Sequence, residues 1–96
     1  MNILITYDVQ TETIAGQKRL RNVARLCLDY GQRVQNSVFE CVLNEMQLAE
    51  LNDKLLHVMD TQNDSIRIYY LSHNEKRWVI TLGKNDAIDV EGSLII

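Results

Sequence analysis

The sequence predicts an α+β fold in which two helices cover one face of an antiparallel sheet. Three observations indicate it: an apolar, β-branched run opens the chain, two later segments have the apolar spacing of helices, and further strand-like runs separate and follow them. The predicted order is strand, helix, strand, helix, strand, strand, which is a βαββαβ pattern in a broad sense. We therefore expect a ferredoxin-like sandwich with an extra C-terminal strand, formed by one domain over residues 1–96.

The first predicted strand, residues 3–8, is apolar until it ends in an acid. Asp8 closes the strand, or Val9 one residue later, and a loop is expected at 11–16. A carboxylate at a strand end can hold a hard cation through its oxygens. Taken alone, Asp8 is equally compatible with an aspartate that caps the turn after the strand.

The first predicted helix, residues 17–30, has an apolar face and a basic face, and Gly31 is a natural residue to end it. The apolar residues at the spacing i, i+3, i+4, i+7 are Leu20, Val23, Ala24 and Cys27. The cations that share a different face are Lys18, Arg21 and Arg25, and Arg19 and Arg33 belong to the same basic segment.

This basic segment is more informative than the net charge of −3. Residues 14–35 carry five cations against one anion, a local charge of +4, and the rest of the chain carries five cations against twelve anions, a charge of −7. Because the local field governs the binding of a polyanion more than the total charge does, the segment predicts a surface for phosphates. The alternative is an ordinary solvated helix face.

The middle of the chain predicts a strand at 33–43 and a second helix that ends near residue 60. Polar residues at 35–37 interrupt the strand, which predicts a bulge or kink. Asn44 with Gln47 three residues later is close to a capping box at the start of the helix. The residues expected to face the core are Leu48, Leu51, Leu55, Val58 and Met59.

The last part of the chain predicts two strands, at 65–71 and 76–82, with Gly83 ending the second. The tail, residues 84–96, is apolar at its end, where chain termini are usually polar. We expect the tail to dock on the sheet edge of a partner subunit or within its own subunit.

A homodimer is also expected from the sheet. If the face away from the helices carries Tyr7, Phe39 and similar side chains, it needs a partner to cover it.

The two cysteines and the hydropathy of the chain predict a cytoplasmic protein. Cys27 and Cys41 are isolated in apolar patterns, which indicates reduced, buried thiols. No apolar run approaches the length of a membrane span, and no secretory signal opens the chain.

Four segments of the chain resemble the CRISPR-associated Cas2 family, the small partner of the Cas1 integrase in spacer acquisition. They are ILITYDV, KRLRNVA, YGQRVQNSVFEC and DSIRIYYL. The string GQRVQNSVFEC also resembles the branch found with subtype I-C systems. The resemblance implies a homodimer in which the first-strand aspartates face each other, so that Asp8 of each subunit holds one Mg²⁺, or Mn²⁺, between them.

The resemblance further implies a metal-dependent endonuclease, with double-stranded DNA or single-stranded RNA as substrate and Asp8 as the catalytic residue. The arginines at matching positions, Arg19, Arg21 and Arg33, are then assigned to backbone phosphates. The other matching residues are Tyr7, Ser37 and Phe39. Tyr7 is equally compatible with plain packing, and Phe39 is more typical of the core or of a dimer interface than of a base-stacking platform.

Three functions therefore stay open from the sequence. The first is a Mg²⁺-dependent nuclease of CRISPR adaptation. The second is a non-catalytic scaffold whose dimer joins Cas1 dimers and spans the incoming DNA, which needs surface and charge but no catalytic carboxylate. The third is a toxin-type ribonuclease of related fold.

Overall fold

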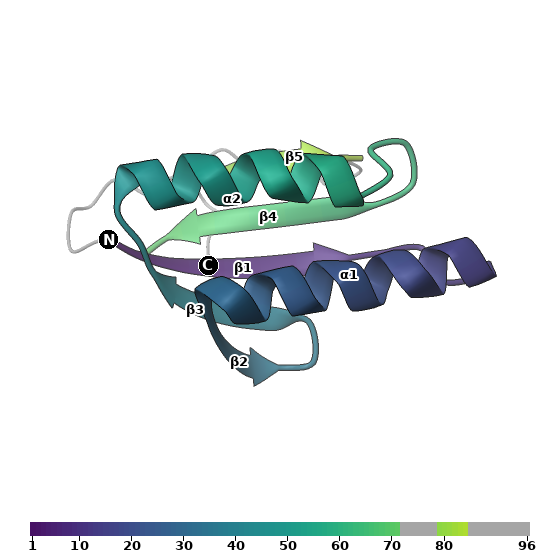
Figure 1. The fold of residues 1–96 in the computed structure, drawn as a ribbon, viewed down its shortest axis with the longest axis horizontal. Helices are drawn as coiled ribbons and strands as arrows, with labels where there is room; N and C mark the ends of the chain where they lie inside the picture. Colours follow the sequence, from purple (N-terminus) through teal and green to yellow (C-terminus); the bar gives the residue numbers. More distant parts are fainter. Residues whose placement is uncertain (72–78, 85–96) are drawn as a thin grey trace.

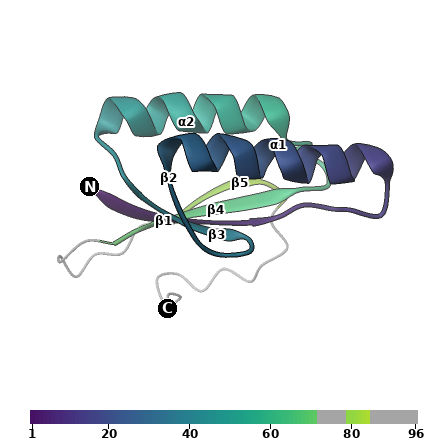
Figure 2. The same cartoon turned by 60° about the horizontal axis from the view of Figure 1, so that its bottom comes forward.

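The computed structural model describes residues 1–71 and 79–84 of the chain. Its elements in chain order are β1 (Asn2–Asp8), α1 (Ile14–Tyr30), β2 (Gly31–Gln35), β3 (Val38–Val42), α2 (Glu45–Val58), β4 (Ser65–Tyr70) and β5 (Val79–Gly83). The strands form one antiparallel sheet in the order β2-β3-β1-β4-β5, with β1 between β3 and β4 (Figure 1). Both helices lie on the same side of this sheet (Figure 2). The ferredoxin-like prediction is confirmed, and β5, which corresponds to the strand expected at 76–82, is the fifth strand of the sheet. The extra strand expected in the tail lies outside the described residues except for Lys84.

The predicted strand at 33–43 is wrong in one respect, because it is a hairpin of two strands. β2 and β3 are joined by a turn at Asn36 and Ser37, and the register of their ladder shifts between Arg33 and Gln35. The bulge expected from the polar residues is therefore present, but the chain also reverses there. Asn and Ser favour turns, yet neither Gly nor Pro marks this one, so its signal in the sequence is weak.

Helix α1 begins three residues earlier than predicted, at Ile14. Thr13 is its N-cap, and the Thr13 hydroxyl accepts a hydrogen bond from the backbone N–H of Gly16 at 2.9 Å. The glycine suggested a loop because glycine is a poor helix former, but the cap overrides that preference. A side chain at position 16 would also collide with the backbone carbonyl of Gln10.

Gly31 ends α1 as predicted, although not in the left-handed conformation expected of a C′ glycine. Its φ of −162° is extended, so the chain passes directly into β2. The glycine is needed for another reason: a Cβ atom there would meet the Cys41 sulfur and the Glu40 carbonyl on the neighbouring strand β3.

Helix α2 confirms the predicted capping box. The Gln47 backbone N–H donates to Asn44 Oδ1 at 2.7 Å, and the Asn44 backbone N–H donates to Gln47 Oε1 at 2.9 Å. The residues that α2 and its C-cap bury are Leu48, Leu51, Leu55 and Met59. In the described part of the chain, no helix is long and apolar enough to cross a bilayer.

The core lies between the sheet and the helices, and it includes both Tyr7 and Phe39. Tyr7 alternates with Thr6 and Asp8 along β1, so the Tyr7 ring points toward the helices together with the completely buried Phe39 ring. The face away from the helices therefore does not carry these two rings, so the condition on which the sequence argument for a covered sheet face depended is not met. We call the face away from the helices the open face; on β1 it carries Leu4, Thr6 and Asp8.

Candidate metal and nucleic-acid site

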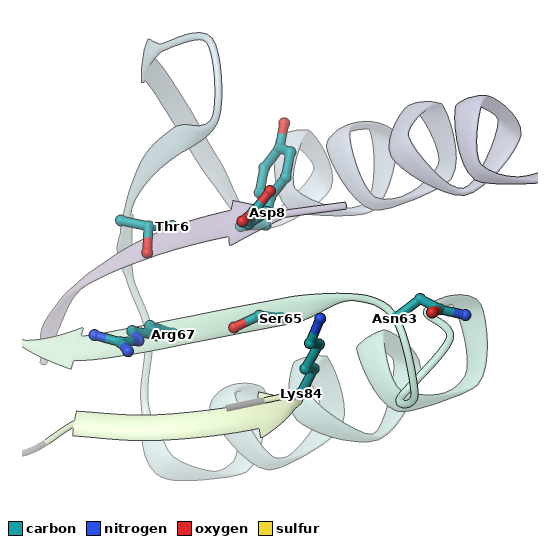
Figure 3. Close-up of a pocket in the computed structure, with 7 residues that line it drawn as sticks. Thr6, Asp8, Asn63, Ser65, Arg67 and Lys84 are labelled. Carbon is teal, nitrogen blue, oxygen red and sulfur yellow. The ribbon is translucent and has the colours of Figure 1, made fainter. Parts of the chain in front are cut away.

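Asp8 lies at the carboxyl end of β1, on the open face, with its side chain exposed. It is directly opposite Ser65 of β4 in the antiparallel register, and Thr6 is opposite Arg67. Around Asp8 is a hollow of about 370 Å³ that the described residues of β1, β4 and their ends form. Its lining residues are Thr6, Tyr7, Asp8, Asn63, Ser65, Arg67 and Lys84 (Figure 3).

The oxygen atoms around this hollow fit a hard cation, but residues 1–71 and 79–84 supply only one carboxylate to its lining. The Asp8 carboxylate is the kind of oxygen ligand that binds Mg²⁺ in proteins, and the hydroxyls of Thr6 and Ser65 and the Asn63 amide add further oxygen atoms to the lining. Within residues 1–71 and 79–84, no three His, Cys, Asp or Glu side chains come together as a ligand group. A metal at Asp8 therefore needs waters, a substrate phosphate or a carboxylate from a second chain to complete its shell.

Two cations that sequence reasoning missed, Arg67 and Lys84, border the same hollow. A signal for Arg67 was available: Ile66 and Ile68 are the buried residues of β4, so the residues between and beside them point to the open face. The pairing of β4 with β1, which brings Arg67 close to Asp8, could not be read from the sequence.

Arg19, assigned to phosphates by the family resemblance, has a protein carboxylate as its partner instead. Its Nε atom donates to Asp64 Oδ2 at 2.8 Å, and the Asp64 side chain has no solvent exposure. The backbone N–H groups of Gln10 and Asp60 donate to the same carboxylate at 3.1 and 2.9 Å. No local pattern in the sequence predicted that Asp64 would be buried and paired with Arg19. An acid that comes just before a strand is usually a solvated turn residue.

The pKa of Asp64 reflects two opposing influences. Burial is the larger single influence and raises it, but the hydrogen bonds from Arg19, Asp60 and Gln10 and the Arg19 charge together hold the pKa below its usual range. The carboxylate is thus stabilised in its charged form, and its role is structural.

The remaining predicted cations of α1 lie apart from Asp8. Lys18, Arg21 and Arg25 are exposed on α1, which covers the opposite face of the sheet (Figure 2). None of the three lines the Asp8 hollow. The structure therefore does not bring this basic surface and the carboxylate into one site, and phosphate binding by these three residues stays a prediction.

Arg33, Tyr7, Ser37 and Phe39 come together between β1 and the β2–β3 hairpin. The Arg33 guanidinium lies 5.2 Å from the centre of the Phe39 ring, and the Tyr7 and Phe39 rings stack at 5.9 Å. The Tyr7 hydroxyl donates to the Asn36 carbonyl at 3.2 Å, and the Tyr7 backbone N–H donates to the Ser37 carbonyl at 3.2 Å. Burial raises the pKa of Tyr7, against the opposing hydrogen bond and charge of Arg33.

These contacts indicate that the side chains around Phe39 and Tyr7 stabilise the packing of the hairpin against β1. Phe39 is a core residue, as expected, and its complete burial leaves no ring face for a base. The hydrogen bonds of Tyr7 fix the hairpin turn beside the strand that ends in Asp8.

Fold and site together define a small ferredoxin-like domain with an exposed acid at the end of its first strand. The family model described as CRISPR associated protein Cas2 matches residues 1–79, and the chain belongs to this family.

Similar proteins agree with this family over most or all of the chain. A Moorella thermoacetica protein named CRISPR-associated endoribonuclease Cas2 1 is 52% identical over 96 residues, with 100% of both chains covered. A Halalkalibacterium halodurans protein named CRISPR-associated endonuclease Cas2 is 52% identical over 95 residues, covering 99% of both.

Solved structures show the same fold. The crystal structure of Streptococcus pyogenes Cas2 at pH 6.5 is 55% identical, with a TM-score of 0.72 over 77% of this chain and 89% of that chain. The hypothetical protein TT1823 from Thermus thermophilus is 30% identical, with a TM-score of 0.67 over 86% of this chain and 96% of that chain.

Proposed function

We propose that this chain is a Mg²⁺-dependent endonuclease with Asp8 as its metal-binding carboxylate. The observation that carries the proposal is the exposed Asp8 carboxylate at the end of β1, in a hollow lined by further oxygen donors and by cations. The relatives named as an endoribonuclease and an endonuclease support hydrolysis of a phosphodiester.

The active form is a homodimer in which two copies of Asp8 share one metal ion. One carboxylate rarely suffices to hold Mg²⁺, which keeps several waters and prefers one or two carboxylates together with substrate phosphates. A dimer of this kind supplies the second carboxylate by symmetry. Light scattering at micromolar concentration should give the mass of two chains, and the mass of one chain would contradict the shared site.

The residues of the hollow have separate tasks in this mechanism. When bound, Mg²⁺ would supply Lewis acidity toward a substrate phosphate and would lower the pKa of a water at the site. Asp8 holds the ion, and the hydroxyls of Thr6 and Ser65 on neighbouring strands can hydrogen-bond to waters or phosphate oxygens around it. No side chain of the protein forms a covalent bond to the substrate.

We place this activity in CRISPR adaptation in the cytoplasm, with double-stranded DNA or single-stranded RNA as substrate. The resemblance to the subtype I-C branch favours DNA. The dimer also bridges Cas1 integrase dimers, and the exposed cations of α1 offer a second surface for a nucleic-acid backbone.

A non-catalytic scaffold is the second candidate. The observation that favours it is the separation between the basic surface of α1 and the Asp8 hollow, because a scaffold needs charge on its surface and no carboxylate near it.

Cleavage assays separate the two candidates. Double-stranded DNA and single-stranded RNA are incubated with wild type, Asp8→Asn and Asp53→Asn, each with Mg²⁺ and with EDTA. Asp53 is an exposed acid on α2, so its replacement makes the same charge change away from the hollow. Cleavage that needs both Mg²⁺ and Asp8, and survives in Asp53→Asn, supports the nuclease. Absence of cleavage by wild type on both substrates, or cleavage indifferent to Asp8, supports the scaffold.

A further inference from the structure

Arg67 lies on the open face, near Asp8 but not paired with it in the same chain. Its neighbours in β4, Ile66 and Ile68, are completely buried toward the helices, so Arg67 points the other way. Arg67 is opposite Thr6 in the antiparallel register, which is two residues, or about 7 Å, from Asp8 along β1. Both side chains line the same hollow (Figure 3). In the part of the chain that the structure describes, no ion pair joins Arg67 to an acid.

The open face is the face that a second chain covers if two copies of Asp8 share one ion. Arg67 is already half-buried in the single chain. One step further from Asp8 the face is apolar, because Leu4 on β1 and Val79 on β5 pair with the same residue of β4. A second chain seated on this surface therefore takes Arg67 out of water. A charge removed from water is costly unless an opposite charge pairs with it.

The acids of the open face indicate which charge this is. The charged side chains that the described strands place on this face are Asp8, Glu40 and Arg67. Glu40 is on β3, on the far side of β1 from β4, so Asp8 is the nearer acid to Arg67 within one chain. Two chains that meet without an ion bring together two Asp8 carboxylates, which repel each other, and two Arg67 guanidiniums, which offset that charge.

We propose that Arg67 is the counter-charge of the Asp8 pair in the metal-free dimer. The two guanidiniums neutralise the two carboxylates while no ion is present, so the chains associate without metal. A divalent cation at the carboxylates takes over this task, and the positive charge of Arg67 lowers the affinity of the site for the cation. The inference rests on the proposed function in one respect, that two copies of Asp8 meet, but it does not require cleavage.

Dimer dissociation in EDTA tests the counter-charge without metal or substrate. Sedimentation equilibrium gives the dimer Kd of wild type, Arg67→Gln, Asp8→Asn and the variant that combines both changes. The matched control combines Arg67→Gln with Glu40→Gln, which removes an exposed acid from the same face of the sheet. Thermal unfolding of each variant shows whether it is folded.

The expected result is a recovery that is specific to Asp8. Arg67→Gln should raise the dimer Kd about tenfold or more, because the two Asp8 carboxylates then face each other without a counter-charge. Adding Asp8→Asn should recover most of this loss, whereas adding Glu40→Gln should not. Arg67→Lys should stay within about threefold of wild type, since it keeps the charge. If Arg67→Gln does not fold, Arg67→Met takes its place, and the same recovery by Asp8→Asn is expected.

Mn²⁺ binding tests the effect of Arg67 on the metal site. At protein concentrations well above the dimer Kd, electron paramagnetic resonance should show that Arg67→Gln binds Mn²⁺ severalfold more tightly than wild type, because a cation beside the site is removed. Mn²⁺ should also restore the dimer of Arg67→Gln. Lys54 is exposed on α2, over the Tyr30 ring, so Lys54→Gln makes the same charge change on the helix layer and should bind Mn²⁺ as wild type does.

The outcomes separate the inference from the proposed function. An unchanged dimer Kd of Arg67→Gln in EDTA, or equal recovery by Glu40→Gln and Asp8→Asn, overturns the inference, as does unchanged Mn²⁺ affinity where wild type binds the ion. A wild type that is monomeric in EDTA also overturns it, but one Mn²⁺ per two chains would then still support the shared site. Recovery by Asp8→Asn in a protein that binds no Mn²⁺ supports the counter-charge and contradicts the metal-dependent nuclease.

Discussion

Asp64 and Arg19 form an ion pair at 2.8 Å in which the carboxylate is completely buried and the guanidinium is 19% exposed. The pair joins helix α1 to the loop that precedes β4. The Gln10 backbone N–H, two residues after Asp8, donates to the same carboxylate, so the pair also fixes the chain just beyond Asp8. A buried pair of this kind is costly to break on one side, because the remaining charge loses its partner.

Replacing the buried acid should destabilise the fold. Asp64→Asn leaves Arg19 without its counter-charge and weakens the bonds from the Gln10 and Asp60 backbones, so we expect the free energy of unfolding to fall by about 3 kcal/mol. Urea denaturation of wild type, Asp64→Asn and the exposed-acid control Asp53→Asn measures this. The control should stay within about 0.5 kcal/mol of wild type. Equal stabilities for Asp64→Asn and the control would contradict the structural role.

The stabilisation from Asp64 should disappear in acid. Its pKa is lowered in the folded state, so the folded protein binds fewer protons than the unfolded chain near the ordinary aspartate pKa of about 3.9. The contribution is therefore complete above that pKa and lost as the pH falls through the lower pKa of the folded state. Urea midpoints between pH 7 and pH 3 should show the difference between wild type and Asp64→Asn shrinking only at the acid end. A difference that stays constant to pH 3 would be inconsistent with this linkage.

Neither cysteine should react in the folded protein. Both thiols are free and buried, as the sequence predicted, and burial, with a smaller effect of Cys41, raises the pKa of Cys27 to about 12. At pH 8 almost none of the Cys27 sulfur is then thiolate, which is the reactive form. A thiol reagent at pH 8 should label the two cysteines only after denaturant is added. Rapid labelling of the native protein would show that the core is open at this position.

The exposed cations of α1 should contribute to DNA binding. Arg21→Gln combined with Arg25→Gln should lower the salt slope of DNA binding by about 1 for each phosphate that the two arginines neutralise in wild type. Arg19 is left unchanged in this test, because its replacement would disturb Asp64. An unchanged slope, with Lys54→Gln again as the control, would mean that this surface does not bind phosphate.

Local signals explain most of what the sequence could predict. The strands β1 and β4 and the capping box of Asn44 and Gln47 depend on neighbours in the chain, and all were expected. The burial of Asp64 and the position of Arg67 opposite Thr6 depend on strand pairing between distant segments, for which local patterns give no register. The burial of Tyr7 could not be predicted for the same reason, because it depends on which face of the sheet the helices cover.

The open face also changes the argument for a dimer. With Tyr7 and Phe39 in the core, the reason for a second chain is no longer an aromatic surface. It is that the described residues supply only the Asp8 carboxylate to the hollow. The predicted docking of the tail, 84–96, lies outside the described residues except for Lys84.

The most direct test of the central claim, a metal site shared by two copies of Asp8, is the stoichiometry of Mn²⁺ binding. Electron paramagnetic resonance measures free Mn²⁺ during titration of wild type, Asp8→Asn and Asp53→Asn. We predict one ion per two chains for wild type and for Asp53→Asn, and loss of this site in Asp8→Asn. One ion per chain, or binding that survives in Asp8→Asn, would contradict the shared site.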